Sequence, residues 1–387
     1  MNRLRSYGQC KAKTNFAHQS TSECACGIPN QRYEARVGFT GGKIWFGQKS
    51  LKRTLHLAIL ITVATAYSVF VSLPTAEGWT ILQERDPDFR DYMSITFTSK
   101  STGWVVGAAS FEDFENPGFI GYTTDGGASW QKSEIKISAD LAEVYFLDEK
   151  HGWAVGADGT IVTTSNGQDW EPQTSKVGNG LKGIYFVNEE VGYAAGESDT
   201  ILSTKNGGRS WKVLQGGQLG AVGDDDANMY NAVQFLDEET GWLAGVRVSP
   251  STQGQSALIQ KTTDGGQSWV TKETGKEDIL EDIFFLNTSM GWAVGENGII
   301  LHTDNGGESW TEQTSGTPET LRSVGFADEN NGWAAGGDFG VGAILRTTDG
   351  GKTWELEDSK EKLVKVFVLD EKNVWLASST GAIMRAE

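Results

Sequence analysis

The chain has 387 residues, with 49 glycines, 14 tryptophans and only 7 prolines, a composition that suits many short strands joined by tight turns. Its charge is unevenly distributed: residues 1–76 carry ten basic and two acidic side chains, whereas residues 77–387 carry 23 basic and 49 acidic ones, a net charge of −26. A body this acidic repels polyanions at long range, so no nucleic acid is expected as a partner.

The N-terminal segment holds all three cysteines, Cys10, Cys24 and Cys26, so the body has no disulfide. Cys24 and Cys26 have one residue between them and no second pair follows, whereas zinc-binding pairs usually have about two to four. We therefore expect no metal and no cofactor. We interpret residues 1–50 as a disordered leader or a mis-assigned start, because an ordinary signal sequence would begin at Leu51.

Residues 55–73 form an apolar run of 19 residues that are uncharged apart from His56. Basic residues up to Arg53 precede it and place its N-terminal side in the cytoplasm. The run is typical of a membrane anchor or of a signal peptide. In both interpretations residues 51–76 direct export, and residues 77–387 lie on the extracytoplasmic side of a membrane.

From residue 77 onward the sequence is built from one repeat. Residues 184–211 (IYFVNEEVGYAAGESDTILSTKNGGRSW) and 283–310 (IFFLNTSMGWAVGENGIILHTDNGGESW) show it without an insertion. Each copy divides into four short runs separated by turn residues and has no helical periodicity, which predicts a four-stranded β-blade. The copies end at Trp130, Trp170, Trp211, Trp269, Trp310 and Trp354.

The number of blades follows from the two ends of the repeat region. Six complete copies are followed by a shortened one at residues 366–387, which stops before its last strand. Residues 78–83, around Trp79, look like such a last strand standing alone. We therefore expect an all-β, seven-bladed β-propeller over residues 77–387, closed by the N-terminal strand around Trp79, which removes the exposed strand edges.

The turn between the third and fourth strands carries an Asp box, such as TTDGGASW at residues 123–130. We expect its Thr and Asp or Asn side chains to satisfy turn backbone groups, its glycines to supply positive φ, and its Trp to pack between blades. These roles are structural, so no catalytic residue is assigned. Besides the six terminal tryptophans, the assigned Asp-box residues are Asp125, Asn206, Asp264, Asn305 and Asp349.

The repeats resemble those of the photosystem II stability and assembly factor family, within the wider group of bacterial neuraminidase-type repeats. The strands Gly152–Gly156, Gly291–Gly295 and Gly332–Gly336 and the Asp boxes that follow them carry the resemblance, which covers residues 78–387. It implies a non-enzymatic propeller, exported to the periplasm or the thylakoid lumen, that binds newly made membrane-protein subunits during the assembly of a complex.

Candidate partner-binding residues come from the family and from two insertions. Members of the family typically offer an arginine-rich patch to their partner, and here Arg346 and Arg385, in the last two blades, could lie near each other. The insertions Ala109–Phe119 and Val246–Ser256 both fall between the second and third strands of a blade, so we expect loops on one face. In the first of them Phe111, Phe114 and Phe119 are candidate contacts.

An enzyme is the alternative to a binding protein. Sialidases share Asp boxes but need a Phe-Arg-Ile-Pro segment, which this sequence lacks. Propeller glycoside hydrolases need only two carboxylates beside the scissile bond, and among 49 acidic residues none is marked by its surroundings. A glycoside hydrolase or a glycan-binding protein therefore stays the second hypothesis. The run Asp224–Asp226 is either a Ca²⁺ ligand set or a solvated loop.

Overall fold

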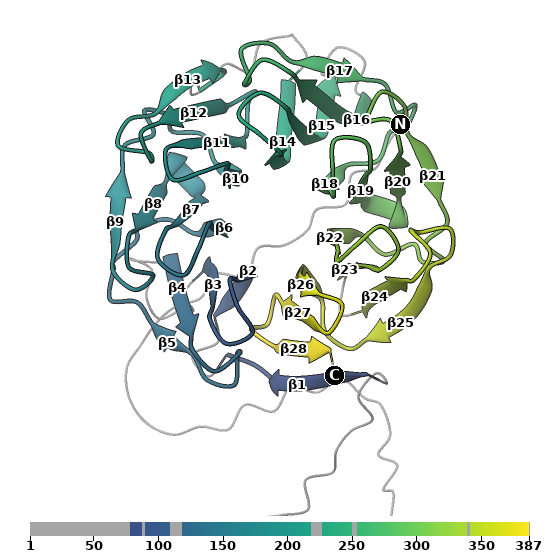
Figure 1. The fold of residues 1–387 in the computed structure, drawn as a ribbon, viewed down its shortest axis with the longest axis horizontal. Coiled ribbons are helices and arrows are strands. Elements are labelled where there is room, and N and C mark those ends of the chain that lie inside the picture. The colour runs from purple at the N-terminus through teal and green to yellow at the C-terminus, as the bar shows by residue number, and fades with distance from the viewer. Residues whose placement is uncertain are drawn as a thin grey trace, which may run out of the picture. The chain divides into compact units, whose positions relative to one another are not determined.

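The computed structural model describes residues 78–86, 90–108, 118–217, 227–249, 254–338 and 341–386. The chain divides into two units, Met1–Phe70 and Val71–Glu387, and every described residue belongs to the second. These residues form seven four-stranded antiparallel sheets arranged in a ring (Figure 1), which confirms the predicted all-β seven-bladed propeller. Two short 3₁₀ turns, Ala157–Gly159 and Glu296–Gly298, each connect the second and third strands of a sheet.

We name the blades A to G around the ring and give their strands from the inside outward. Blade A contains β26 (Leu363–Asp370), β27 (Asn373–Ser378), β28 (Ile383–Ala386) and β1 (Trp79–Gln83). Blade B contains β2 (Asp91–Phe97), β3 (Gly103–Ala108), β4 (Gly118–Thr123) and β5 (Gln131–Lys132). Blade C contains β6 (Leu141–Phe146), β7 (Gly152–Gly156), β8 (Ile161–Thr164) and β9 (Trp170–Gln173).

The other four blades follow the same order. Blade D contains β10 (Leu181–Phe186), β11 (Val191–Gly196), β12 (Ile201–Lys205) and β13 (Lys212–Gln215). Blade E contains β14 (Ala227–Phe235), β15 (Gly241–Ser249), β16 (Gly254–Thr262) and β17 (Val270–Lys272). Blade F contains β18 (Leu280–Phe285), β19 (Gly291–Gly295), β20 (Ile300–Thr303) and β21 (Thr311–Gln313). Blade G contains β22 (Leu321–Phe326), β23 (Gly332–Asp338), β24 (Val341–Thr347) and β25 (Glu355–Ser359).

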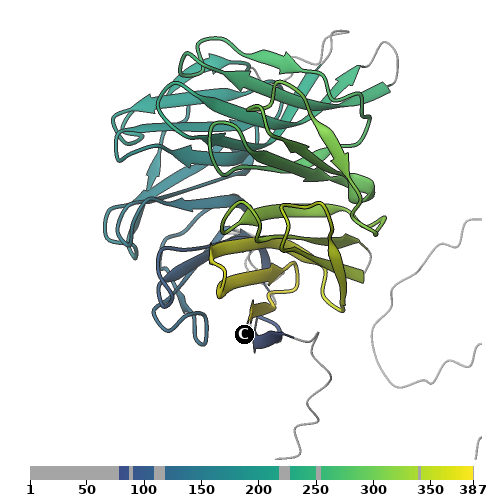
Figure 2. The same ribbon diagram turned by 45° about the vertical axis from the view of Figure 1, so that its right-hand side comes forward.

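Blade A closes the ring with strands from both ends of the described chain. β1 runs antiparallel to β28, with Trp79 opposite Ala386, and the two strands lie side by side in Figures 1 and 2. Trp79 is 5% exposed and packs with Trp333 of blade G. Its indole N–H also donates to the Glu357 carboxylate on β25, at 3.1 Å. The predicted closure around Trp79 is therefore confirmed.

An aromatic contact repeats from blade to blade. The ring of Trp104 on β3 lies flat on Phe146, at the end of the next blade's inner strand, with a centroid distance of 3.5 Å. The terminal Trp170 of that blade meets the same Phe146 edge-on at 5.6 Å. The flat stack occurs at six of the seven interfaces between the described blades, while β26 carries Val368 at the Phe position of the seventh. The repeat thus builds its core between the blades.

The insertion in blade E corrects the sequence analysis. The prediction of a loop over Val246–Ser256 is wrong for most of its length, because β15 and β16 continue as a paired hairpin from Val246 opposite Ala257 to Ser249 opposite Gly254. Valines that alternate with polar residues suit such a half-exposed strand pair.

Several segments and residues named above lie outside the described residues: residues 1–50, the apolar run 55–73, Phe111, Phe114 and Asp224–Asp226. Among the residues that the structure describes, no helix has the length and apolar character needed to cross a membrane.

Candidate functional site

The two faces of the ring carry different turns. On one face, each Asp box contacts the turn that joins the first and second strands, as where the Gly126 N–H donates to the Ser101 carbonyl at 2.8 Å. On the other face, the turn between the second and third strands contacts the entry to the inner strand, as where the Ala157 N–H donates to the Asp140 carbonyl at 2.9 Å. We call these the Asp-box face and the entry face.

The seven inner strands surround a central channel with a cavity of about 810 Å³. Each inner strand has an irregularity in its register with the second strand, as between Leu141 and Glu143. Such bulges change the direction in which the following side chains point. Residues just after the irregularity form a ring around the channel. Its members are Ser94, Glu143, Gly183, Ala232, Asp282, Ser323 and Lys365. Four are small, which leaves room for the three charged side chains.

Lys365 joins two carboxylates from other parts of the ring. Its Nζ lies 3.3 Å from Glu143 Oε2 in blade C and 3.7 Å from Asp282 Oδ2 in blade F. Burial alone would lower the pKa of the Lys365 ammonium, but the carboxylates of Asp282 and Glu143 outweigh it and raise that pKa. Burial raises the pKa of Glu143, although Lys365 opposes the shift. A charged cluster thus lies inside the channel.

The residues inside these irregularities, one position nearer the entry face than the ring residues, form a second polar group. Lys182 Nζ donates to Asn231 Oδ1 at 3.1 Å. Arg322 lies 2.9 Å from the Asp338 carboxylate and 3.8 Å from that of Glu281. Arg322 therefore has carboxylate partners within the fold.

Two positions further along the inner strands, toward the Asp-box face, the cavity wall is aromatic. Tyr145, Tyr185, Phe284 and Phe367 all line it. The rings of Tyr145 and Tyr185 are 4.7 Å apart between centroids, and burial raises the pKa of both hydroxyls. The channel therefore combines a charged section with a neutral aromatic one, as small-molecule and peptide sites commonly do.

Arg346 and Arg385 occupy equivalent positions in the neighbouring blades G and A. Each lies opposite the second-strand Trp of its blade, Arg346 opposite Trp333 and Arg385 opposite Trp375. The guanidinium carbons lie 5.7 and 4.9 Å from the ring centroids, within cation–π distance. Arg385 also donates to Asn373 Oδ1 at 2.6 Å. Within the described part of the chain neither arginine forms an ion pair.

Nitrogen-bearing side chains occupy the same position in two further blades, which the sequence analysis missed. Lys261 Nζ of blade E lies 5.7 Å from the centroid of the Trp242 ring, but it also forms an ion pair with Glu308 Oε1 at 3.1 Å. His302 of blade F packs on Trp292 at 5.1 Å, and burial lowers its pKa. Aligning the residue before the Asp-box Thr in each repeat would have revealed this series.

The Asp-box side chains are committed to their turns. Asp125 accepts from the Ser129 N–H at 2.9 Å and from the Ser129 hydroxyl at 2.6 Å, while Thr123 Oγ1 accepts from the Gly127 N–H at 3.0 Å. Asp264 makes the same bonds, and those from Ser268 lower its pKa to about 2. Equivalent bonds are made by Asn206, Asn305 and Asp349.

Phe119 lies in the interior of its blade. It is 1% exposed on β4, where it stacks on Tyr92 at 5.7 Å and lies under the guanidinium of Arg90 at 4.4 Å. The expectation that its ring faces a partner does not match this placement, because β4 begins at Gly118, inside the insertion.

Comparisons with solved structures identify the same fold in several proteins. The structure of YCF48 bound to D1 peptide has a TM-score of 0.61 at 19% identity, covering 81% of this chain and 98% of that one. YCF48 from Cyanidioschyzon merolae also has a TM-score of 0.61, at 18% identity, with coverage of 80% and 99%. Streptogramin B lyase has a TM-score of 0.58 at 14% identity, with coverage of 81% and 99%, so the fold also occurs in an enzyme. No curated protein sequence matches the chain.

The sequence matches a family model described as photosynthesis system II assembly factor YCF48. The match consists of overlapping segments at residues 124–221, 168–273, 221–325 and 269–387, which follow the repeat and together span more than half of the chain. This protein therefore belongs to the YCF48 family of photosystem II assembly factors.

Proposed function

We propose that this protein is a non-catalytic assembly factor that binds an exposed segment of a membrane-protein subunit while photosystem II is assembled. Membership of the YCF48 family supports this function, as does the solved structure of a YCF48 protein bound to D1 peptide. The surface around Arg346 and Arg385 is the proposed contact.

We assign the contact surface to these two arginines because of how their charges are paired within the fold. Lys261, Arg322 and Lys365 each have a carboxylate partner, whereas Arg346 and Arg385 have none among the described residues. Both guanidinium groups are instead held against tryptophan rings, which orders them before a partner arrives. Arginine binds carboxylates through two parallel hydrogen bonds. An acidic side chain or a C-terminal carboxylate of the subunit is the matching group.

Peptide binding tests this surface. Fluorescence anisotropy of the full chain with labelled peptides from the exposed segments and C-termini of photosystem II subunits should show binding that weakens with added salt. R346Q and R385Q should each weaken binding by roughly tenfold. R209Q is the matched control, because Arg209 is an exposed arginine in the Asp box of blade D. Equal losses in all three variants, or no peptide binding by the wild type, would overturn the assignment.

We also propose that the propeller lies on the extracytoplasmic side of its membrane. The basic residues before the apolar run at 55–73 support this orientation, as does the family. Protease treatment of sealed vesicles whose cytoplasmic face is turned outward should leave the propeller intact until detergent is added. Digestion before detergent would place it in the cytoplasm.

A further inference from the structure

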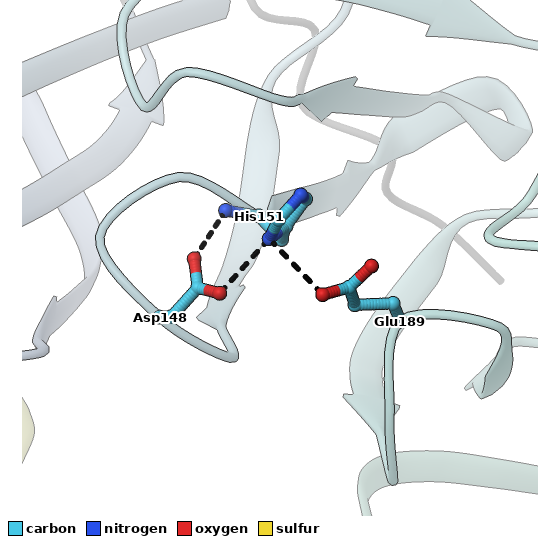
Figure 3. A group of neighbouring side chains, drawn as sticks. All are labelled: Asp148, His151 and Glu189. Atoms are coloured by element: carbon cyan, nitrogen blue, oxygen red, sulfur yellow. Dashed lines mark hydrogen bonds and ion pairs between the residues drawn. The ribbon is translucent and has the colours of Figure 1, made fainter.

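The turns that join the first and second strands of blades C and D bring one imidazole and two carboxylates together on the Asp-box face (Figure 3). His151 Nδ1 lies 2.9 Å from Asp148 Oδ2 and 3.8 Å from Glu189 Oε1, and one donor atom from each residue lies within 4.8 Å of the others. We propose that Asp148, His151 and Glu189 bind a divalent first-row transition-metal ion. The site is separate from the channel and from the two arginines.

The spacing of the donors is close to what such an ion requires. At tetrahedral angles, bonds of about 2.0–2.2 Å to nitrogen and oxygen place neighbouring donors roughly 3.3–3.6 Å apart. The observed 2.9 and 3.8 Å lie on either side of this range, so small rotations of the side chains suffice. His151 coordinates through Nδ1, so in the bound state the hydrogen of the neutral ring is on Nε2.

Asp148 is positioned by the turn to be a ligand. Its Oδ1 accepts from the backbone N–H groups of Lys150 at 2.7 Å and His151 at 2.8 Å, which fixes the carboxylate and leaves Oδ2 directed at the imidazole. The carboxylate is therefore oriented before an ion arrives.

The repeat shows that the turn itself does not require the histidine. The backbone N–H at this position donates to the first turn residue in other blades too, for example from Val191 to Asn188 and from Thr240 to Asp237. The side chains there are varied and none is an imidazole: Thr102, Val191, Thr240, Met290, Asn331 and Asn373. The contact between turns also recurs without a histidine, where Asn188 donates to Glu238 at 3.0 Å. The imidazole of His151 is thus an addition to a turn that forms without it.

The donor set indicates the class of ion. One imidazole nitrogen with two carboxylate oxygens suits Zn²⁺, Ni²⁺ or Cu²⁺ better than Mg²⁺ or Ca²⁺, which favour all-oxygen sites. Three protein donors leave at least one coordination position open. That position faces solvent on the Asp-box face, where water or a donor from a second protein can complete the coordination.

Isothermal titration calorimetry of the full chain with ZnCl₂ tests the site. Alkylation with iodoacetamide first removes the thiol ligands, since all three cysteines precede residue 27. We expect H151N and E189Q to weaken zinc binding by at least about tenfold. H302N is the matched control, because His302 is the other histidine of the propeller and should leave the affinity unchanged.

Three results would overturn the proposal: a wild-type protein without a zinc site, an affinity that H151N leaves unchanged, or an equal loss in H302N. Circular dichroism of each variant shows whether the propeller is intact. Titration with MgCl₂ separates a transition-metal site from general attraction of cations by the acidic body, since the latter would respond equally to both ions.

Discussion

The indole N–H of Trp104 in blade B donates a hydrogen bond of 2.6 Å to the carbonyl oxygen of Gly167, in the Asp box of blade C. The same bond joins other neighbouring blades: Trp153 to Gly207, Trp242 to Gly306 and Trp375 to Gly126. Gly167 has a φ of +77°, a conformation open to glycine at little cost, and this backbone presents its carbonyl to the neighbouring blade. The Gly-Trp strand and the Asp box, distant within each repeat, are therefore two halves of one contact.

Trp104 and Trp292 together allow the energy of this bond to be measured. Both are buried and stack on a Phe of the next blade, at 3.5 and 3.6 Å, but the buried Nε1 of Trp292 has no hydrogen-bond partner among the described residues. Each Trp-to-Phe substitution removes similar volume, and only W104F leaves a carbonyl without its donor. We expect W104F to lower the free energy of unfolding by about 1 kcal/mol more than W292F, as measured by urea denaturation. Equal losses would mean that stacking alone holds the blades together.

The channel cluster predicts a stability effect that depends on pH. K365M would leave Glu143 and Asp282 without their shared cation. We expect it to lower the free energy of unfolding by about 2 kcal/mol at pH 7. This is less than for a fully buried pair, because the Lys365 and Glu143 side chains are 21% and 22% exposed. Glu143 has a folded pKa above its unfolded value, so the folded state binds more protons and stability falls as pH rises through that interval. Losing Lys365 raises this pKa further, so the loss should be smaller at pH 4 than at pH 7.

Lys182 provides the control for that measurement. It lines the same cavity, but its ammonium bonds to the neutral amide of Asn231. K182M should therefore lower the free energy of unfolding by less than K365M does at pH 7, in the same urea denaturation series. If the two variants lose equal stability at both pH values, the ion cluster does not stabilise the channel.

The fold could be predicted from the sequence because its information is local and repeated. The spacing of the terminal tryptophans set the number of blades, and Trp79 standing outside any complete copy indicated how the ring closes. The hairpin in blade E and the buried Phe119 were missed for one reason: an insertion was assumed to be a loop, whereas pairing continues wherever both strands can extend.

The candidate sites were harder to predict because their residues are far apart in the sequence. Lys365 and Glu143 are 222 residues apart and meet only because equivalent positions of all blades face one channel. His151 and Glu189 come from different repeats, so neither copy alone shows a metal site. A comparison of the repeats position by position, rather than a search for motifs, would have found both groups of residues.

Closure of the ring by β1 should be as important to this protein as any contact within a blade. Trp79 is buried against blade G, and without it β1 would detach and leave the hydrogen-bonding edge of β28 exposed. We expect W79A to lower the free energy of unfolding by about 3–5 kcal/mol and to promote self-association through that edge. Ile81 on the same strand is 44% exposed, so I81A should change the free energy of unfolding by less than about 0.5 kcal/mol. It should also leave the oligomeric state the same as that of the wild type. Urea denaturation and size-exclusion chromatography with light scattering would measure both effects. If W79A behaved like I81A, the packing of Trp79 against blade G would not be what holds β1 in place.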